Sequence, residues 1–344
     1  MRVVNICQFG AGRIGAIHAE NISNHPAADL KWVVDIDLSV AGKLAEQYGA
    51  KATLDPQEAL SDTNIDGVLI ASSTDTHVDL ILAAMQAEKV VFCEKPIDLD
   101  LQRVDEFSSN IAKLGCPLLI GFNRRFDPSF RALQRSVREG KVGTVEILKI
   151  TSRDPAPPTI EYIRNSGGLF RDMMIHDFDM ARWILGEELA EVCATGSCLV
   201  EEKIGQAGDV DTASVMMRTN SGVICLIDNS RRATYGYDQR IEVFGSKGML
   251  QAGNTSPTTL SWWTDKGISK DKPPYFFVDR YEMAYRAELD HFIQVITGEA
   301  DPLVRYVDGR QALALAEAAF ISSEGNGVKV NSDMFHSDQT AERI

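Results

Sequence analysis

A glycine-rich turn near the amino terminus, Gly10-Ala11-Gly12-Arg13-Ile14-Gly15, constrains the fold of this chain more than any other feature. It separates an apolar run, residues 3–9, from a segment with helical periodicity, residues 13–23. The first glycine permits a tight turn, the second lets the backbone approach a bound group, and the third allows close helix–strand packing. The amino end of the helix offers free N–H groups and a dipole that favour phosphate. The motif therefore predicts a dinucleotide-binding strand–turn–helix unit, although glycine turns of this kind also arise by chance.

An acidic residue in the expected place points to a particular cofactor. Asp35 ends a second apolar run, residues 30–34, about 20 residues beyond the turn. A carboxylate there can accept hydrogen bonds from the ribose hydroxyls of NAD and would repel the 2′-phosphate of NADP. An ordinary polar strand end is the alternative; we expect NAD, in preference to NADP. The predicted cofactor-binding residues are Gly10, Gly12, Arg13, Ile14, Gly15, Asp35, Ser73, Thr74, His77, Glu94 and Lys95.

The first third of the chain alternates short apolar strands with helical segments. Further strands are expected at residues 67–71, 90–93 and 118–121, and further helices at residues 40–48, 78–87 and 101–114. Such alternation predicts a parallel, doubly wound sheet with helices on both faces. We therefore expect an α/β Rossmann domain over residues 1–121.

The pattern changes after residue 121. Helices are expected at residues 129–139, 169–185, 282–296 and 308–323. Strands are expected at residues 145–152, 191–199, 212–218, 222–229, 239–244 and 259–263. Consecutive strands with short turns predict a mainly antiparallel sheet. Residues 122–344 are thus expected to form an α+β catalytic and oligomerisation domain, with a loose polar tail from about Asp333.

Composition and charge restrict the partners. The net charge is −14, from 35 Lys and Arg against 49 Asp and Glu, which argues against nucleic acid and anionic membrane as main partners. No apolar run approaches the ~18 residues of a membrane span, and the first strand leaves no room for a signal peptide. The six cysteines are scattered, and neither Cys nor His clusters at metal-ligand spacing. We expect a cytoplasmic protein with reduced thiols and no metal site.

Two further motifs suggest acid–base chemistry. Asp172 and His176 stand at positions i and i+4 of an expected helix, so that their side chains share one face. Histidine titrates near neutral pH, and an adjacent carboxylate can orient it. Lys95, within Glu94-Lys95-Pro96, follows a strand at the carboxyl edge of the expected sheet, where such sheets bind ligands. Pro96 is a candidate for a cis bond. Taken alone, an i,i+4 pair is usually a surface pair and a strand-end lysine is usually solvated.

Together these motifs resemble the family of glucose–fructose oxidoreductase, inositol dehydrogenase and rhizopine-catabolism proteins. The residues that carry the resemblance are the glycine turn, Glu94-Lys95-Pro96 and Gly168-Leu169-Phe170-Arg171-Asp172-Met173-Met174-Ile175-His176. Segments 121–127, 152–158 and 176–183 are similar to the inositol dehydrogenase subgroup. The likeness covers nearly the whole chain.

The resemblance implies NAD-dependent oxidation of a secondary alcohol of a cyclic polyol, with myo-inositol giving 2-keto-inositol (scyllo-inosose). It implies that Lys95, Asp172 and His176 are catalytic, and that a substrate-contacting tyrosine falls on Tyr235, with Tyr237 as the neighbouring alternative. The candidate substrate-binding residues are Lys95, Asn123, Arg125, Arg153, Asp154, Asp172, His176 and Tyr235. Lys95 and the imidazole of His176 are expected to converge beside a bound nicotinamide.

Several alternatives stay open. The substrate can be another inositol isomer or an aldose, and relatives of this fold include NAD-dependent glycoside hydrolases. A non-catalytic NAD-binding sensor is a third alternative. For Asn123, Arg125, Arg153 and Asp154, a solvated loop or a structural ion pair fits the sequence as well as a substrate contact does. The resemblance favours a homotetramer, but the sequence fixes neither the oligomeric state, nor the isomer, nor the physiological direction.

Overall fold

The computed structural model describes residues 2–332, which fall into two compact units. The first unit comprises residues 2–123 and 285–311, and the second comprises residues 124–284 and 312–332. The first unit thus takes a late segment that the predicted division places in the second domain. The reason is packing within this unit, because Phe292 contacts Phe92 edge-on, with ring centroids 5.6 Å apart. The polar tail predicted from about Asp333 lies outside the described residues.

A parallel sheet of six strands forms the centre of the first unit, in the order β3-β2-β1-β4-β5-β6. The strands are β1 (Val4–Phe9), β2 (Ala28–Val34), β3 (Lys51–Thr53), β4 (Gly67–Ile70), β5 (Val90–Glu94) and β6 (Leu118–Gly121). The predicted Rossmann sheet is confirmed. Only β3 was not expected, because three residues carry too little apolar pattern to indicate a strand. The strand order reverses between β1 and β4, and such a reversal opens a ligand crevice at the carboxyl edge.

Helices join these strands. They are α1 (Arg13–Asn24), α2 (Leu38–Tyr48), α3 (Pro56–Leu60), α4 (His77–Gln86) and α5 (Leu101–Leu114), with the 3-10 turns η1 (Thr74–Thr76) and η2 (Asn123–Phe126). Helix α5 shows why they form where they do. Asp100 caps its amino end by accepting from the N–H of Gln102, and Val104, Phe107 and Ile111 bury one stripe of its surface. Helix α10 (Phe277–Ile296) ends within this unit.

The second unit contains a seven-stranded sheet in the order β12-β11-β7-β10-β9-β8-β15. Its strands are β7 (Val145–Arg153), β8 (Leu189–Ser197), β9 (Thr212–Thr219), β10 (Ile224–Ser230), β11 (Asp238–Gly245), β12 (Gly248–Ala252) and β15 (Val330–Asn331). Every neighbouring pair is antiparallel except β7 and β10. The predicted mainly antiparallel sheet is confirmed.

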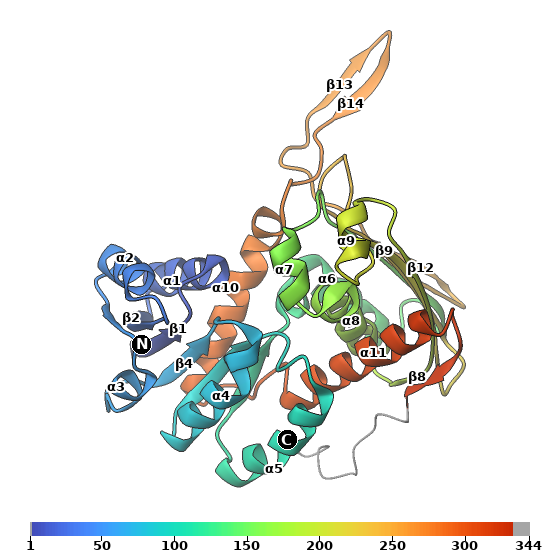
Figure 1. The fold of residues 1–344 in the computed structure, drawn as a ribbon. Coiled ribbons are helices and arrows are strands. Elements are labelled where there is room, and N and C mark those ends of the chain that lie inside the picture. Colours follow the sequence, from blue (N-terminus) through green and yellow to red (C-terminus); the bar gives the residue numbers. More distant parts are fainter. Residues whose placement is uncertain (1, 333–344) are drawn as a thin grey trace. The chain divides into compact units, whose positions relative to one another are not determined.

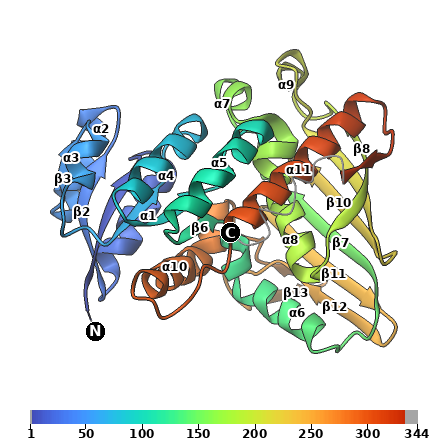
Figure 2. The same cartoon turned by 90° about the horizontal axis from the view of Figure 1, so that it is seen from below.

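One face of this sheet is covered by helices. The helices of the unit are α6 (Pro128–Arg138), α7 (Ile160–Asn165), the π-turn η3 (Leu169–Met173), α8 (Ile175–Leu185), α9 (Glu202–Gln206) and most of α11 (Tyr306–Glu324). Figure 2 shows α6 and α8 beside the strands. In strand β9, successive side chains are alternately buried and exposed, as expected of a sheet with one covered face. Its Ala213, Val215 and Met217 are buried, whereas Met216 between them is exposed on the opposite face.

The strand expected at residues 259–263 does not join the sheet. It forms a separate hairpin, β13 (Ser261–Thr264) with β14 (Gly267–Lys270), which projects from the unit in Figure 1. Trp262 and Trp263 on it are 68% and 72% exposed, so their β propensity misled the prediction. The place beside β11 is taken by β12, which a short turn after Gly245 brings directly alongside.

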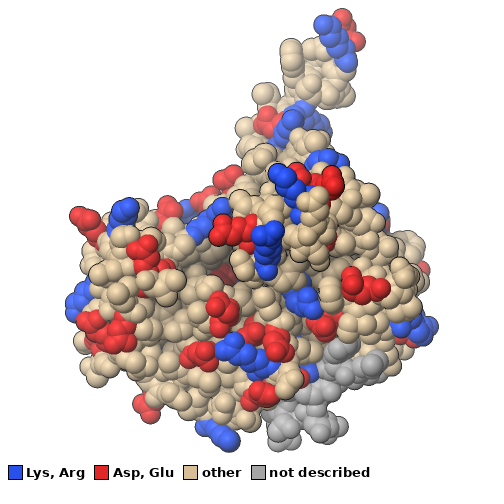
Figure 3. Space-filling model, viewed as in Figure 1, with Lys and Arg blue, Asp and Glu red and all other residues tan. Residues whose placement is uncertain are grey.

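The surface of the molecule carries charges of both signs. Acidic and basic side chains are interspersed on the face that Figure 3 shows. Among residues 2–332, no helix combines the length and the apolar character that crossing a membrane requires.

Candidate functional site

The glycine turn of the first unit has the geometry of a phosphate cradle. Gly10 has a φ of +96°, and a Cβ on it would collide with the carbonyl oxygen of Ala71 in the loop after β4. A Cβ on Gly15 would collide with the carbonyl oxygen of Gly10, whereas a Cβ on Gly12 would meet nothing within 4 Å. The backbone is therefore close-packed on two sides and open at Gly12, where a pyrophosphate needs access.

A buried glutamine stabilises this turn, and the sequence analysis did not single it out. The Nε2 of Gln8 donates to the carbonyl oxygens of Gly10 and Gly15, at 2.8 and 2.9 Å. A polar residue inside an otherwise apolar strand was the signal for it. Helix α1 begins immediately after the turn, with Arg13 exposed and Ile14 half-buried.

Asp35 lies where a ribose-binding carboxylate is expected, at the carboxyl end of β2. Its two oxygens accept from the backbone N–H groups of Ala11, at 2.7 Å, and Asp37, at 3.0 Å. These bonds fix the carboxylate beside the glycine turn. The next residue, Ile36, is 97% exposed, and sequence reasoning missed it because one apolar residue in a loop carries no pattern.

The loop after β4 contains three predicted cofactor-binding residues. Ser73 is exposed, Thr74 is half-buried and His77 is only 1% exposed. The imidazole of His77 lies 2.8 Å from the carbonyl oxygen of Pro96 and 3.2 Å from that of Ser72, and burial lowers its pKa. The side chain thus ties the loop after β4 to the loop after β5. We assign it this structural role, and a cofactor contact from its imidazole stays a prediction.

Lys95 follows β5, and its bond to Pro96 is cis. The preceding carboxylate, Glu94, lies 2.7 Å from the Nε2 of His18, which is buried on α1 between the rings of Phe92 and Tyr285. This contact anchors the backbone that presents the lysine. His18 was missed because a histidine on a helical face is usually an ordinary polar residue.

A second carboxyl group lies deep in the same unit. Both oxygens of Glu288 are buried without a hydrogen-bond partner among the described residues. Burial, with a smaller effect from the charge of Glu94, raises its pKa well above the ordinary value. The surroundings of Glu288 therefore favour its protonated form. Sequence periodicity gave no means to distinguish it from a surface glutamate of α10.

In the second unit, Asp172 and His176 do not lie on one continuous α-helix as expected. Asp172 belongs to the π-turn η3, and His176 to the first turn of α8. The N–H of Met174 donates to the carbonyl oxygen of Leu169, an i to i+5 bond of 2.9 Å. The pair is therefore divided between a π-turn and an α-helix, and π-turns are frequent at functional sites.

Two residues that the sequence analysis did not name contact Asp172. The hydroxyl of Tyr162 donates to its Oδ1 at 2.8 Å, and the guanidinium of Arg231 lies 3.7 Å from its Oδ2. Arg231 lies equally 3.7 Å from the Oδ2 of Asp209. The predicted substrate residue Asp154 is half-buried, and burial raises its pKa to about 6. The charge of Arg231 lowers this pKa, and the charge of Asp172 raises it. Contacts this distant in sequence have no local pattern.

Arg125 is engaged in a buried ion pair. Its Nε and Nη2 donate to the two carboxylate oxygens of Asp179 at 2.9 and 2.6 Å, and its guanidinium lies over the ring of Trp183. This arrangement agrees with the structural ion pair that was the alternative for this residue. Asn123, at the end of the first unit, is likewise buried.

Arg153 and Tyr235 are in contact with each other. The Nη1 of Arg153 lies 3.3 Å from the hydroxyl of Tyr235, and its Nε donates to Asp228 at 2.9 Å. Tyr235 is 40% exposed, whereas Tyr237 is 5% exposed and packs against Tyr281. Of the two tyrosines, only Tyr235 thus presents its ring to a ligand.

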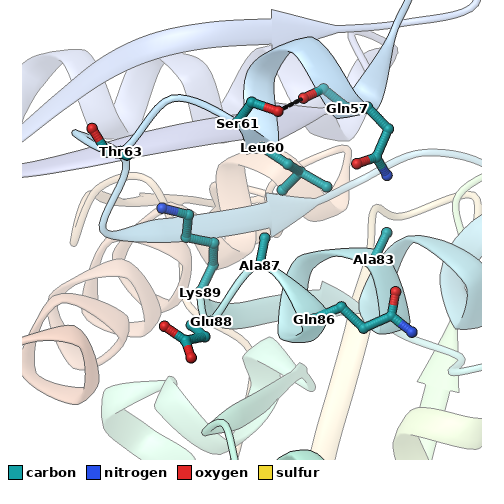
Figure 4. A pocket seen from close by; sticks show the side chains of 9 residues that line it. All are labelled: Gln57, Leu60, Ser61, Thr63, Ala83, Gln86, Ala87, Glu88 and Lys89. Atoms are coloured by element: carbon teal, nitrogen blue, oxygen red, sulfur yellow. Dashed lines mark hydrogen bonds between the residues drawn. The ribbon is translucent and has the colours of Figure 1, made fainter.

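A hollow of about 530 Å³ lies elsewhere in the first unit (Figure 4). Its lining residues are Gln57, Leu60, Ser61, Thr63, Ala83, Gln86, Ala87, Glu88 and Lys89. Lys89 immediately precedes β5, so the hollow lies at the amino edge of the sheet, opposite the glycine turn. It therefore does not belong to the candidate site. Within residues 2–332, no group of His, Cys, Asp or Glu side chains is arranged to hold a metal ion.

Comparison with known proteins extends these observations. Residues 4–122 match the oxidoreductase family with an NAD-binding Rossmann fold, and residues 130–251 match the GFO/IDH/MocA C-terminal domain. Myo-inositol 2-dehydrogenase of Thermotoga maritima is 50% identical over 92% of this chain and 95% of its own length. Inositol 2-dehydrogenase of Rhizobium meliloti is 48% identical over 90% of this chain and 94% of its own length.

A solved structure agrees with the fold of the whole chain. The crystal structure of scyllo-inositol dehydrogenase from Lactobacillus casei, with bound NAD(H) and scyllo-inositol, superimposes with a TM-score of 0.90. It is 29% identical, and the match covers 96% of this chain and 100% of that one. The resemblance found in the sequence motifs is confirmed, and the chain belongs to the GFO/IDH/MocA family of NAD-binding oxidoreductases.

Proposed function

We propose that this protein oxidises a ring hydroxyl of an inositol with NAD as the hydride acceptor, converting myo-inositol to 2-keto-inositol. One observation carries the proposal. The chain keeps the dinucleotide cradle together with Lys95, Asp172 and His176, in a sequence half identical to a named myo-inositol 2-dehydrogenase. The match to inositol dehydrogenases at both sequence and structure favours a cyclic polyol over an open-chain sugar.

The cofactor fit rests on the first unit. The open backbone at Gly12 and the uncapped amino end of α1 suit a pyrophosphate, and Asp35 suits the ribose hydroxyls of NAD. A carboxylate held rigidly by two backbone N–H groups would repel a 2′-phosphate, so we infer a preference for NAD over NADP. The exposed side chain of Ile36 is then available to pack against the adenine ring.

Proton transfer falls to the second unit. A secondary alcohol loses hydride readily only as its hydroxyl proton leaves, and His176 is the proposed acceptor of that proton. Asp172 stabilises the charged imidazole, and the ammonium of Lys95 stabilises the developing alkoxide. NAD, when bound, supplies the hydride acceptor at its nicotinamide ring.

Substrate recognition needs many polar partners, because each ring hydroxyl that leaves water must be paired again. Arg153 supplies a donor in the second unit, and the half-buried Asp154 supplies an acceptor. The hydroxyl of Tyr235 donates to Asp238 at 2.6 Å, so it offers an acceptor. Asn123 stays a candidate in the first unit. The buried pairing of Arg125 with Asp179 favours a supporting role for that arginine over a substrate contact.

Self-association is a further part of the proposal. The face of the seven-stranded sheet opposite α6 and α8 exposes apolar side chains that are neighbours across strands, with Leu226 opposite Met216 and Phe244 opposite Ile147. Exposed apolar residues grouped in this way suit a second copy of the chain. We propose a homotetramer in the cytoplasm. Light scattering on the wild type and on Leu226→Glu tests it, since the charged variant should fall to a smaller assembly.

The decisive experiment is a polyol panel with myo-inositol, scyllo-inositol and glucose, followed by NADH absorbance with NAD and NADP in parallel. We expect the largest kcat/KM with myo-inositol and NAD. Net NADH formation from a free polyol separates a dehydrogenase from a glycoside hydrolase, which returns its NAD unchanged. Tight NAD binding without NADH formation from any polyol would refute the proposal and favour a sensor.

A further inference from the structure

The carboxylate of Asp172 is contacted at both oxygens by residues outside the predicted catalytic set. We propose that Tyr162 and Arg231 are positioning residues, which together fix the carboxylate of Asp172 in the orientation that proton transfer at His176 requires. This inference rests on the proposed function, because Asp172 and His176 are catalytic only if that function holds. Tyr162, Arg231 and Asp172 belong to one compact unit, so their contacts are internal to it.

Tyr162 contacts one oxygen of the carboxylate. It lies on α7, which begins where the hydroxyl of Thr159 accepts from the N–H of Tyr162 at 3.3 Å. From there its hydroxyl reaches the Oδ1 of Asp172 at 2.8 Å. Tyr162 is 49% exposed as a whole residue, but partial burial and the charge of Asp172 raise the pKa of its hydroxyl, so the hydroxyl is the donor to the carboxylate. A hydrogen bond to a charged acceptor is worth more than a neutral one.

Arg231 lies beside the other oxygen. Its side chain is 1% exposed, and its backbone N–H is anchored on the carbonyl oxygen of Asp211 at 2.8 Å. At 3.7 Å from both Asp172 and Asp209, the guanidinium makes charge contacts with each carboxylate. A buried cation requires compensating anions. The two carboxylates therefore stabilise the position of the guanidinium, and the guanidinium stabilises theirs.

The same chain of charges fixes the backbone that carries Asp172. The Oδ1 of Asp209 accepts from the N–H of Leu169, the first residue of η3, at 3.0 Å. Gly168 makes room for this contact, since it has a φ of +79° and a Cβ on it would lie 2.7 Å from the same oxygen. The start of the π-turn and the side chain near its end are therefore held by one linked set, Asp209, Arg231 and Asp172.

The chemical consequence concerns proton transfer more than substrate binding. Losing either partner lets the carboxylate rotate away from its working orientation, which lowers turnover. The polyol contacts proposed for Arg153 and Tyr235 are left in place, so substrate affinity should change little. A group that acts through Asp172 also loses its effect once Asp172 itself has been removed.

The test is a double-mutant cycle of Tyr162→Phe with Asp172→Asn, assayed with NAD and the best polyol of the panel. We expect Tyr162→Phe to lower kcat about tenfold, to change KM less than about twofold, and to have almost no further effect in the Asp172→Asn protein. Tyr275→Phe, at an exposed tyrosine of the same unit, is the matched control and should behave as wild type. An equal loss in both backgrounds, or a rise in KM with kcat unchanged, would overturn the assignment of Tyr162.

Arg231 is tested with two substitutions because its burial makes misfolding a risk. Arg231→Gln should lower kcat at least tenfold, and Arg231→Lys, which keeps the charge, should recover part of the loss. Titration of His176 by NMR supplies a readout independent of turnover, and its pKa should shift in Tyr162→Phe and in Arg231→Lys. An unchanged His176 titration in both would overturn the proposal. A wild type without polyol oxidation, but with these shifts present, would instead refute only the proposed function.

Discussion

Two buried carboxyl groups, one in each unit, are accommodated in different ways. In the first unit, Glu288 is buried without a hydrogen-bond partner among the described residues, and burial raises its pKa well above the ordinary value. In the second unit, the buried Asp179 is paired with Arg125, and Asp172 lies beside Arg231. The environment of Glu288 favours the protonated form, whereas Asp179 and Asp172 are compensated by cations.

This difference follows from what each unit has to do. A dinucleotide is bound largely by backbone N–H groups and glycine geometry, so its binding needs few charged side chains. A polyol has to be recognised through its hydroxyls and deprotonated, so the second unit needs fixed charges near the reacting group. Their positions have to be maintained by further charged residues, which explains the density of ion pairs there.

The largest expected effect separates catalysis in the second unit from cofactor binding in the first. His176→Ala should lower kcat about 10²–10⁴-fold, because it removes the proton acceptor. The affinity for NAD should stay within about twofold of wild type, since the cradle at Gly10, Gly12 and Gly15 is untouched. Steady-state kinetics and NAD titration check both values. Turnover near the wild-type level would contradict the assignment of His176.

The buried ion pairs of the second unit should dominate its stability. Arg125→Ala removes the guanidinium that is paired with the buried Asp179, so it should lower the free energy of unfolding by about 3–5 kcal/mol. The matched control is Arg153→Ala, which breaks a partly exposed pair with Asp228 and should cost about 1 kcal/mol or less. Urea unfolding measures both. Equal losses would show that burial of the first pair is unimportant.

The raised pKa of Glu288 predicts a stability that falls with pH. The folded state retains the proton of Glu288 to higher pH than the unfolded state, which releases it above about pH 4.5. Wild type should therefore lose up to about 1.4 kcal/mol of unfolding free energy per pH unit above that value, relative to Glu288→Gln. The comparison is made by urea unfolding between pH 5 and 8. A difference that stays constant with pH would mean that Glu288 is ionised in the folded protein.

Asp154 of the second unit should give a smaller effect with an upper limit. Burial raises its pKa to about 6, whereas the unfolded value is about 4. The folded state therefore carries more bound proton than the unfolded state only between about pH 4 and 6. Relative to Asp154→Asn, wild type should lose about 1–2 kcal/mol across that window and no more above it, once partial exposure is allowed for. Unfolding at pH 4, 6 and 8 tests this. If the stability difference between wild type and Asp154→Asn still grows at pH 8, the pKa of Asp154 in the folded state is well above 6 and the prediction is wrong.

The Rossmann unit was the more predictable of the two. Its glycine turn, Asp35 and its apolar strands are patterns that can be read from short stretches of sequence. The mainly antiparallel character of the second sheet was predicted correctly, but residues 259–263 were wrongly included in it. Their β propensity indicates a strand but does not show which sheet the strand joins. Asp172 was found from its motif, whereas Tyr162, Asp209 and Arg231 were not.

The sequence by itself determined the two-part architecture, the dinucleotide cradle and the residues proposed for catalysis, since periodicity, turn chemistry and motif spacing are all local. The tertiary structure alone decided how those residues are supported. It placed His18 on Glu94, turned an expected α-helix into a π-turn at Asp172, and set Arg231 between two aspartates. Burial and charge compensation depend on distances between segments that lie far apart in the chain, and only the folded chain defines those distances.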